Sequence, residues 1–343
     1  MQQPLVHISN LNLQYHNKWL FKGLNWHMLK GDNWVIGGKS GSGKTALAKL
    51  IAQQIQGQET ATLHFDAGSS LPAKVHYVSN WYQFTNLDGD RNFYYQQRYN
   101  KQQKNDTLTV YAELDHFAKQ EGLVMSDVDP LLRLFGFQQA QETQLIELSS
   151  GEHKKLQLIQ ALWLKPQLLI IDEPYTGLDK SSRTHLNSLL DAYIREGLTL
   201  LLISNDQDLP QGIKHFGHIE DAKLVEVANT EEFAKNESRS PKQLPYFLQQ
   251  KPAVTCETLI DLQNIFVRYG DKEVLKNVSW TVNVGDRWLL QGPNGSGKST
   301  LLSLLNGDHP QAYANNVTLF GQKRGSGESI WDIKEKVGII SPE

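Results

Sequence analysis

The glycine-rich stretch Gly38-Lys39-Ser40-Gly41-Ser42-Gly43-Lys44-Thr45 decides the fold of this chain. It fits the P-loop pattern, in which a glycine is followed by four residues and then by Gly-Lys-Thr or Gly-Lys-Ser. An apolar run at 33–37 predicts a strand before it, and residues 46–54 predict a helix after it. The glycines let backbone N–H groups turn inward around a phosphate, and the helix dipole favours the same charge. We expect Lys44 to reach the β- and γ-phosphates of a nucleotide and Thr45 to bind Mg²⁺.

A second copy of the motif, Gly292-Pro293-Asn294-Gly295-Ser296-Gly297-Lys298-Ser299, lies 254 residues later (292 minus 38). In this copy we expect the stretch and Thr300 to bind a nucleotide, with Ser299 on the metal. The flanking residues keep the same offset without a gap. The matching pairs are Asn10 and Asn264, Tyr15 and Tyr269, Trp26 and Trp280, Gly31-Asp32 and Gly285-Asp286, and Trp34 and Trp288. An ungapped repeat of this length indicates a duplicated domain, because its period is far too long for a solenoid.

Length and composition agree with about two domains of ordinary size. The 343 residues are 39% hydrophobic and 21% charged, as is usual for a soluble protein with buried cores. The net charge of −3 argues against a generally basic nucleic-acid binder. The single cysteine, Cys256, has no partner for an internal disulfide, which suits a reducing cytosol.

Neither a membrane span nor a signal peptide is predicted. Apolar runs stay well short of the roughly 18 residues that cross a bilayer. The start, Met1-Gln2-Gln3-Pro4, lacks the basic and apolar regions of a signal peptide. We therefore expect a cytoplasmic protein that would work at the inner face of a membrane only through a separate partner.

Residues 5–36 alternate polar and apolar side chains in short runs, the pattern of antiparallel strands. Tyr15 stands about two dozen residues before the first P-loop, and Tyr269 holds the same place before the second. An aromatic ring there can stack on a purine, although a core tyrosine of a small sheet is the alternative. The recurrence at one offset favours stacking.

A further strand is predicted at 74–79, followed by Asn80. Beyond it, the stretch from Arg91 to Tyr99 mixes two arginines with four aromatic residues. Such a mixture suits base stacking or docking of a partner protein. A half-buried helix whose rings pack locally remains the other interpretation.

Two more motifs follow the first P-loop. Leu148-Ser149-Ser150-Gly151-Glu152 opens a predicted helix, with Ser149 as its N-cap, so a second helix N-terminus is available to an anion. The apolar run at 168–171 predicts a buried strand that ends in Asp172-Glu173-Pro174. An acid at the end of a buried parallel strand can bind the Mg²⁺ beside a P-loop, as Asp172 would. Glu173 could then take a proton from the attacking water.

These motifs, followed by Gly177-Leu178-Asp179 and a buried strand at 198–203, resemble those of the ATP-binding cassette (ABC) ATPases. The resemblance covers residues 5–225 and starts again at 259. It implies an α/β fold of the P-loop NTPase class and ABC type. Such a fold has a mixed sheet core, an antiparallel β subdomain and a helical subdomain, here with a partial second copy.

The motif at the start of the helix before the acid pair, here Leu148-Ser149-Ser150-Gly151-Glu152, is the signature of this family. In the family two cassettes pair head to tail, and ATP lies between the P-loop of one cassette and the signature of the other. The resemblance implies that Ser149, Ser150 and Gly151, with Glu152 beside them, contact the γ-phosphate of ATP held by an opposing cassette. It also implies that Asp172 helps to hold Mg²⁺, that Glu173 is the general base and that Asp179 lies at the dimer seam.

The sequence departs from the family pattern at two places. A switch histidine is usual at the end of the strand after Asp179, but Asn205 follows Ile203-Ser204 here. The family's glutamine after the strand at 74–79 appears as Asn80, unless the alignment slips and Gln83 serves. Both changes remove groups that order the γ-phosphate and the attacking water. We therefore expect a site, including Asn80 and Asn205, that binds ATP better than it hydrolyses it.

The domain boundaries follow from composition and from the repeat. We expect a first cassette over 1–225, a linker over 226–258 that contains three prolines, and the N-terminal part of a second cassette over 259–343. Residues 307–311 and 319–334 resemble the second cassette of ModF-type proteins, tandem cassettes associated with molybdenum transport genes. Within them, Arg324-Gly325-Ser326-Gly327 is either another anion nest or an ordinary glycine turn.

A strand expected at 337–341 corresponds to 75–79 with an offset of 262 (337 minus 75). The second signature, acid pair and switch residue would follow it, and they are not among the 343 residues. We therefore expect no complete hydrolytic site within one copy of this chain. Two copies could still pair through their first cassettes, with slow turnover.

The first functional hypothesis is a soluble ABC ATPase that uses ATP and Mg²⁺ at paired cassettes and serves transport, with molybdate suggested by family likeness alone. Its expected partners are a second cassette, in cis or in a homodimer, and a membrane permease. The alternative is an ATP-controlled regulator or ribosome-associated factor. The short linker and acidic balance count against a ribosome role, and the stretch at 91–99 counts for it. A P-loop kinase is disfavoured because the signature at Ser149 would have no role in such an enzyme.

Overall fold

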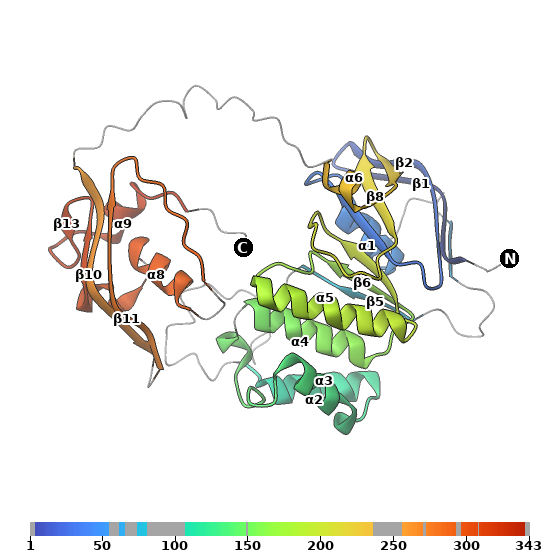
Figure 1. Cartoon of the computed structure of the whole chain (residues 1–343), viewed down its shortest axis with the longest axis horizontal. Helices are drawn as coiled ribbons and strands as arrows, with labels where there is room; N and C mark the ends of the chain where they lie inside the picture. The colour runs from blue at the N-terminus through green and yellow to red at the C-terminus, as the bar shows by residue number, and fades with distance from the viewer. Residues whose placement is uncertain are drawn as a thin grey trace. The chain divides into compact units, whose positions relative to one another are not determined.

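The computed structural model describes residues 4–54, 62–65, 74–80, 107–148, 150–235, 256–269, 272–292, 296–307 and 309–339. These residues belong to two compact units. The first unit contains the described residues up to 235, and the second contains those from 256 onward (Figure 1).

The first unit is built on a six-stranded sheet with the order β5-β6-β7-β3-β8-β9. Neighbours from β5 to β8 are parallel, and β9 pairs antiparallel with β8. The strands are β3 (Trp34–Gly38), β5 (Val75–Val78), β6 (Leu168–Asp172), β7 (Thr199–Ile203), β8 (His215–Glu220) and β9 (Lys223–Val227). The four predicted from apolar runs, namely β3, β5, β6 and β7, lie within about one residue of their expected bounds. The α/β class predicted from the P-loop and these buried strands is confirmed.

Side chains of the central strands alternate between two cores, because successive residues of a strand point to opposite faces. In β3, Trp34 and Ile36 lie in one core and Val35 lies in the other. In β6, Leu168 and Ile170 share the core of Trp34, whereas the residues between them face the opposite side. Burial on both faces explains why these strands read as continuous apolar runs.

Helices cover the two faces of this sheet. Four of the helices that contribute to the core of Val35 lie on one side of the sheet (Figure 1). They are α2 (Val110–Glu121), α3 (Asp129–Phe135), α4 (Ser150–Trp163) and α5 (Lys180–Arg195). The 3-10 helices η3 (Met125–Val128) and η4 (Leu145–Glu147) contribute to the same core. Helix α1 (Lys44–Ile51) packs on the opposite face, in the core of Trp34.

A second, antiparallel sheet closes over α1. Its order is β2-β1-β4, with β1 (Pro4–Tyr15), β2 (Lys18–Leu29) and β4 (Thr62–Phe65). The short runs predicted over 5–36 are joined in the structure into two strands of 12 residues each. A register shift between Ile8 and Leu11 separates the runs, and Asn10 adopts a φ of 50° there.

The first unit extends into the predicted linker over 226–258. Strand β9 reaches Val227, and helix α6 (Thr230–Lys235) follows it. Phe233 of α6 is only 1% exposed and packs in the core of Val35. Burial of this ring attaches residues 226–235 to the first unit. The linker was predicted from proline and charge content, which do not reveal such a tertiary contact.

The second unit repeats the antiparallel part. Its sheet has the order β11-β10-β12-β13, formed by β10 (Thr258–Tyr269), β11 (Lys272–Asn283), β12 (Asn316–Leu319) and β13 (Gln322–Lys323). Helices α8 (Lys298–Leu305) and α9 (Ile330–Lys334) and the 3-10 helix η5 (Pro310–Ala314) complete it. The strand expected at 337–341 is not formed over 337–339, the part of it that the structure describes.

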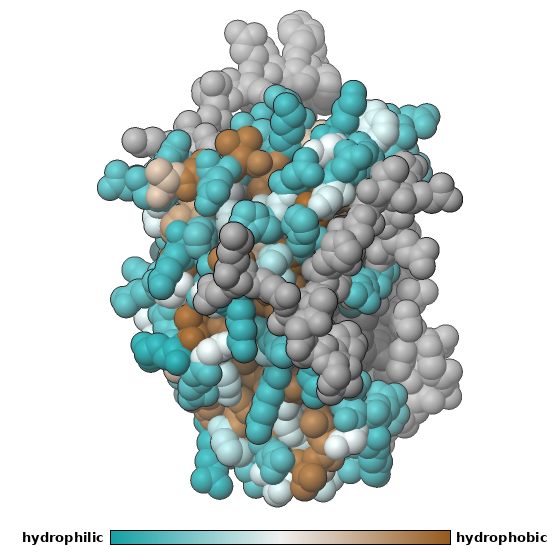
Figure 2. All heavy atoms as spheres, turned by 90° about the vertical axis from the view of Figure 1, so that its right-hand side faces the viewer, coloured by the Kyte–Doolittle hydropathy of each residue, from teal (hydrophilic) through white to brown (hydrophobic). Residues whose placement is uncertain are grey.

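The surface is mixed. Hydrophilic side chains cover most of the coloured face in Figure 2, and apolar ones appear between them in small groups. Within the described ranges, every helix is too short or too polar to cross a bilayer.

Candidate nucleotide-binding and catalytic site

The first P-loop joins β3 to α1 through three glycines with positive φ angles. Gly38 has a φ of 134°, Gly41 of 74° and Gly43 of 108°, values that other residues rarely adopt. A Cβ atom on Gly38 would also lie 2.8 Å from the carbonyl oxygen of Ile219. Lys44 folds back over the loop, and its Nζ donates to the carbonyl of Gly38 at 2.6 Å. The sequence motif therefore forms the turn that its glycines predicted.

The acid at the end of β6 lies beside this loop. The hydroxyl of Thr45 donates to Oδ2 of Asp172 at 2.7 Å, although 127 residues separate them in the chain. Tyr77 of β5 donates to the same oxygen at 3.0 Å. Burial and the neighbouring Asp172 carboxylate raise the pKa of Tyr77, so its hydroxyl keeps its proton and remains a donor.

The residues around Asp172 fit a magnesium ion. Asp172 is 2% exposed, and its Oδ1 atom is buried and has no hydrogen-bond partner among the residues that the structure describes. An unpaired buried carboxylate oxygen is costly unless a cation or donor satisfies it. Mg²⁺ prefers oxygen ligands, and it is usually held by one or two protein groups together with phosphates and waters. Thr45 and Asp172 are the residues that would hold it.

Glu173 directly follows the strand in a strained conformation, with a φ of 47°. Its backbone N–H donates to the carbonyl of Ile203 at 2.9 Å, which fixes the turn to β7. Burial, and then repulsion by Asp172, raises the pKa of the Glu173 carboxyl, while Lys44 acts in the opposite direction. A raised pKa makes this carboxylate a better proton acceptor near neutral pH.

These groups line one cleft of about 700 Å³, a size typical of ligand pockets. Tyr15, which is 65% exposed, also lines it. The Oδ1 atom of Asn80, another lining residue, is buried, and no described residue hydrogen-bonds to it. The remaining lining residues are Lys18, Leu20, Ser40, Gly41, Gly43, Lys44, Thr45, Ala46, Lys49, Tyr77, Ser79, Asp172 and Glu173.

Asn205 lies against the P-loop. Its Oδ1 accepts from the backbone N–H of Gly38 at 2.8 Å, and its Nδ2 donates to the carbonyl of the same glycine at 3.2 Å. The sequence placed Asn205 at the switch position of the family. The structure shows its amide engaged on both sides with the first glycine of the loop.

The signature region begins α4. Gly151 is buried and Glu152 is half-buried in the first turn of the helix. Asp179 caps the next helix, because its Oδ1 accepts from the backbone N–H of Ser182 at 2.8 Å. Several predicted residues lie outside the described residues: Gln83, the stretch 91–99, Ser149, Pro293, Asn294 and Gly295.

Sequence reasoning missed Lys154. This lysine is 2% exposed, and its Nζ donates to the carbonyls of Ser79 at 2.9 Å and Asp172 at 3.0 Å. Burial lowers its pKa to about 8. Helical spacing could have indicated that Lys154 is buried. Leu158 and Ala161 follow it at intervals of four and seven residues, which place them on the same helix face, and both are buried.

The second P-loop has the same lysine contact. Nζ of Lys298 donates to the carbonyl of Gly292 at 2.7 Å, and Gly297 precedes α8 with a φ of 88°. In α8, Ser299 is exposed and Thr300 is buried. The Tyr269 hydroxyl lies 2.7 Å from Nε2 of His309, and the ring packs partly against the core of this unit. Tyr269 is thus half-buried against this core, whereas Tyr15 is exposed.

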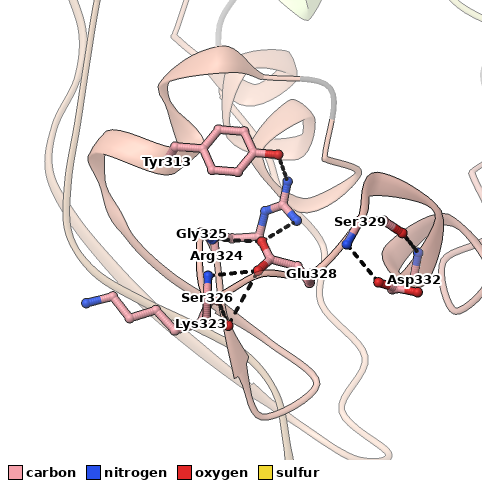
Figure 3. A network of polar contacts seen from close by, with 8 residues as sticks. All are labelled: Tyr313, Lys323, Arg324, Gly325, Ser326, Glu328, Ser329 and Asp332. Carbon is pink, nitrogen blue, oxygen red and sulfur yellow. Dashed lines mark hydrogen bonds and ion pairs between the residues drawn. The ribbon is translucent and has the colours of Figure 1, made fainter.

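The predicted nest at 324–327 holds an internal anion (Figure 3). The backbone N–H groups of Gly325 and Ser326 donate to the Glu328 carboxylate at 2.7 and 2.9 Å. Nη1 of Arg324 donates to the same carboxylate at 2.9 Å. The side chains of this pair are 0% and 2% exposed, so the glycine turn is closed by its own glutamate.

Comparison with known proteins identifies the family of this chain. The ABC transporter family matches residues 21–176 and 275–343, which include both P-loops. The chain therefore belongs to the ABC transporter ATP-binding family.

Two relatives extend over nearly the whole chain. The chain is 36% identical over 333 residues to the ABC transporter ATP-binding protein ModF of Escherichia coli (strain K12), covering 91% of this chain and 64% of that protein. It is 30% identical over 338 residues to an uncharacterized ABC transporter ATP-binding protein of Schizosaccharomyces pombe, covering 94% of this chain and 68% of the relative. The chain thus spans about two thirds of the length of these relatives.

Solved structures share the fold at low sequence identity. Superposition on cbiO1 from Clostridium perfringens, part of the ABC transporter complex cbiONQ, gives a TM-score of 0.51 at 21% identity. It covers 68% of this chain and 92% of that one. A bacterial Atm1-family ABC exporter with ATP bound gives a TM-score of 0.54 at 16% identity, over 70% of this chain and 43% of the exporter.

Proposed function

We propose that this chain is an ABC-type ATPase subunit that binds ATP with Mg²⁺ at its first P-loop and hydrolyses it. The observation that carries this proposal is the 2.7 Å contact between Thr45 and Asp172. This contact joins the end of the P-loop to the acid at the end of β6, at the edge of a cleft that Glu173 also lines.

The residues of the chain divide the proposed reaction among them. The loop N–H groups and Lys44 bind the phosphates, and Tyr15 offers an exposed ring to the base. When bound to Thr45 and Asp172, Mg²⁺ would supply positive charge at the transferring phosphate. Glu173 accepts a proton from the attacking water, and Asn80 offers a buried acceptor that can orient that water.

The remaining parts of the proposal rest on family likeness. In the head-to-tail arrangement, the residues from Ser149 to Glu152 would act on ATP held by another cassette, either in cis or in a second copy of the chain. A membrane permease would be the partner in transport, at the cytoplasmic face of a membrane. The likeness to ModF-type proteins suggests molybdate as the cargo. We also propose that residues 1–225 form one cassette and that residues 259–343 are the N-terminal part of a second cassette, with the boundary between them in the region of 226–258.

Steady-state phosphate release tests the proposal. Wild-type protein should release phosphate slowly, at a specific rate that rises with protein concentration as copies pair. Glu173→Gln should lower the rate by about 10²- to 10⁴-fold, because it removes the general base. ATP affinity should be retained in this variant.

Glu196→Gln provides the matched control, since Glu196 is exposed at the end of α5 and should leave the rate unchanged. Fast turnover that is independent of protein concentration and unaffected by Glu173→Gln would rule out the proposed mechanism. Absence of ATP binding in the wild type would rule out the proposed function as a whole.

A further inference from the structure

Lys154 connects the first turn of α4 to the edge of the sheet where the candidate catalytic groups lie. The side chain leaves the helix three residues after Gly151 and is almost completely buried. Its ammonium lies between the carbonyl oxygens of Ser79 and Asp172, at 2.9 and 3.0 Å. These two carbonyls belong to the ends of neighbouring parallel strands, since Val78 of β5 is in register with Ile171 of β6.

The two carbonyls immediately precede functional positions. Ser79 comes before Asn80, whose buried Oδ1 has no hydrogen-bond partner within the described part of the chain. Asp172 comes before Glu173. Beyond Ile171 and Val78 the strand ladder ends, so the peptides that orient these side chains are no longer held by β-pairing between β5 and β6. On the β7 side, Asp172 still pairs with Ile203, and the N–H of Glu173 donates to the carbonyl of Ile203. On the β5 side, the ammonium of Lys154 links the two backbones at the point where β5 and β6 separate.

Packing alone does not explain a lysine here. A buried charge is costly, and an apolar residue of similar volume at such a place is often neutral or stabilising. Lys154 lies on the same helical face as Leu158 and Ala161, which are buried apolar residues of α4. A methionine would therefore suit the surroundings, but it would remove the N–H donors that Lys154 offers to both carbonyls.

We propose that Lys154 is a positioning residue of the site. It holds the backbone of Asp172 and Glu173 in place relative to Asn80 through the carbonyls of Asp172 and Ser79. This inference rests on the proposed ATPase function. Because Gly151 and Glu152 share the first turn of α4 with Lys154, the lysine also ties the signature helix to the acid pair of the same chain. The side chain of Lys154 can thus transmit the effect of a contact at the signature to Asp172 and Glu173.

The test compares Lys154→Met with Lys155→Met in the full chain. Lys155 is the next residue of α4 and is only half-buried, so its variant serves as the matched control. Three quantities are measured: ATP affinity without metal, Mn²⁺ affinity in the presence of ATP by electron paramagnetic resonance, and steady-state phosphate release. Thermal melting reports whether each variant is folded.

Lys154→Met should bind ATP without metal as the wild type does, because the lysine donates its hydrogen bonds to Ser79 and Asp172, outside the P-loop. Its Mn²⁺ affinity and its turnover should each fall about ten- to a hundredfold, the usual cost of losing a contact behind a metal ligand. Lys154→Arg keeps the charge and the donors and should recover most of both losses. Lys155→Met should match the wild type in all three measurements.

Wild-type Mn²⁺ affinity and turnover in folded Lys154→Met would overturn the inference while leaving the ATPase proposal intact. If Lys154→Met does not fold, Lys154→Gln replaces it, since the amide keeps an N–H donor without the charge. Reduced Mn²⁺ affinity in Lys154→Gln with unchanged metal-free ATP affinity would support the inference, and wild-type values would overturn it. If the wild type binds neither ATP nor Mn²⁺, the proposed function and this inference fail together.

Discussion

The two copies of the repeat fold alike in one part and differently in another. The hairpins β1–β2 and β10–β11 have bounds that differ by the sequence offset of 254 at every end. Helices α1 and α8 show the same offset. Even the irregular backbone recurs, since Asn10 and Asn264 have φ angles of 50° and 51°. The edge-to-face tryptophan pair also recurs, with ring planes at 82° for Trp26–Trp34 and for Trp280–Trp288.

The copies differ at the strand that leads into the P-loop. In the first unit, Trp34, Val35 and Ile36 form β3 between β7 and β8 and are at most 5% exposed. In the second unit, the matching residues 288–290 have no regular structure. The exposed fractions of Trp288, Leu289 and Leu290 are 61%, 79% and 40%.

The difference shows which elements local sequence can form. A hairpin and a helix make their hydrogen bonds within a short span of chain. A parallel strand depends on neighbours that are distant in the sequence, as β3 depends on β7 and β8. An apolar run therefore shows that a segment can become a strand, and the strand forms only where neighbouring strands are present to hydrogen-bond with it.

The largest expected effect is a contrast between two tryptophans. Trp34→Ala should destabilise the first unit by about 3–5 kcal/mol, because it empties a buried site between two sheets. Trp288→Ala, at an exposed position, should change the free energy of unfolding by no more than about 0.5 kcal/mol. Urea denaturation followed by hydrogen exchange of each unit measures both. Equal losses would mean that the segment at 288–290 is packed in solution.

The next prediction compares the ATP affinities of the two P-loops. Lys44→Ala in a Lys298→Ala background should weaken ATP binding about tenfold to a hundredfold, since hydrogen bonds to charged groups contribute about 1.5–3 kcal/mol. Lys298→Ala alone should weaken total binding less, because the first P-loop has Thr45 and Asp172 beside it. Calorimetric titration with ATP distinguishes the variants. Unchanged affinity in the double variant would contradict nucleotide binding at either loop.

The smallest effect concerns a matched pair of glycines. Gly31 and Gly285 have φ angles of 86° and 91°, and an added Cβ would meet nothing within 4 Å at either place. Replacement of either by alanine should cost about 1–2 kcal/mol through the left-handed backbone alone. The two losses, measured by urea denaturation, should agree. Gly23→Asn is the control, because Asn277 already adopts a φ of 53° at the matching position, and it should have little effect.

Much of the fold and of the candidate site could be predicted from the sequence. The P-loop, the acid pair and the buried strands are marked by residue types that their local geometry requires. Glycine is needed at the positive φ of Gly38, and a continuous apolar run is needed in a strand covered on both faces. The placement of Thr45 beside Asp172 followed from the same motifs, because P-loops and strand ends meet at one edge of a parallel sheet.

Other contacts were decided only by the tertiary structure. Lys154 looks like a surface residue in the sequence, and its role appears only when β5 and β6 bring two carbonyls together at their ends. Asn205 could be recognised as a departure from the family, but its two bonds to Gly38 could not be foreseen. The sequence left residues 324–327 as either an anion nest or an ordinary glycine turn, and only the folded chain shows that Glu328 closes the turn.

The sequence by itself determined the elements whose hydrogen bonds close locally: the hairpins, the P-loop turns and the helices that follow them. They recur in both copies at a fixed offset of 254 because each contains its own bonding partners. Only the tertiary structure decided which apolar run became a strand and which polar side chain reached the site. Those outcomes depend on groups far apart in the chain, whose meeting is set by packing rather than by any local pattern.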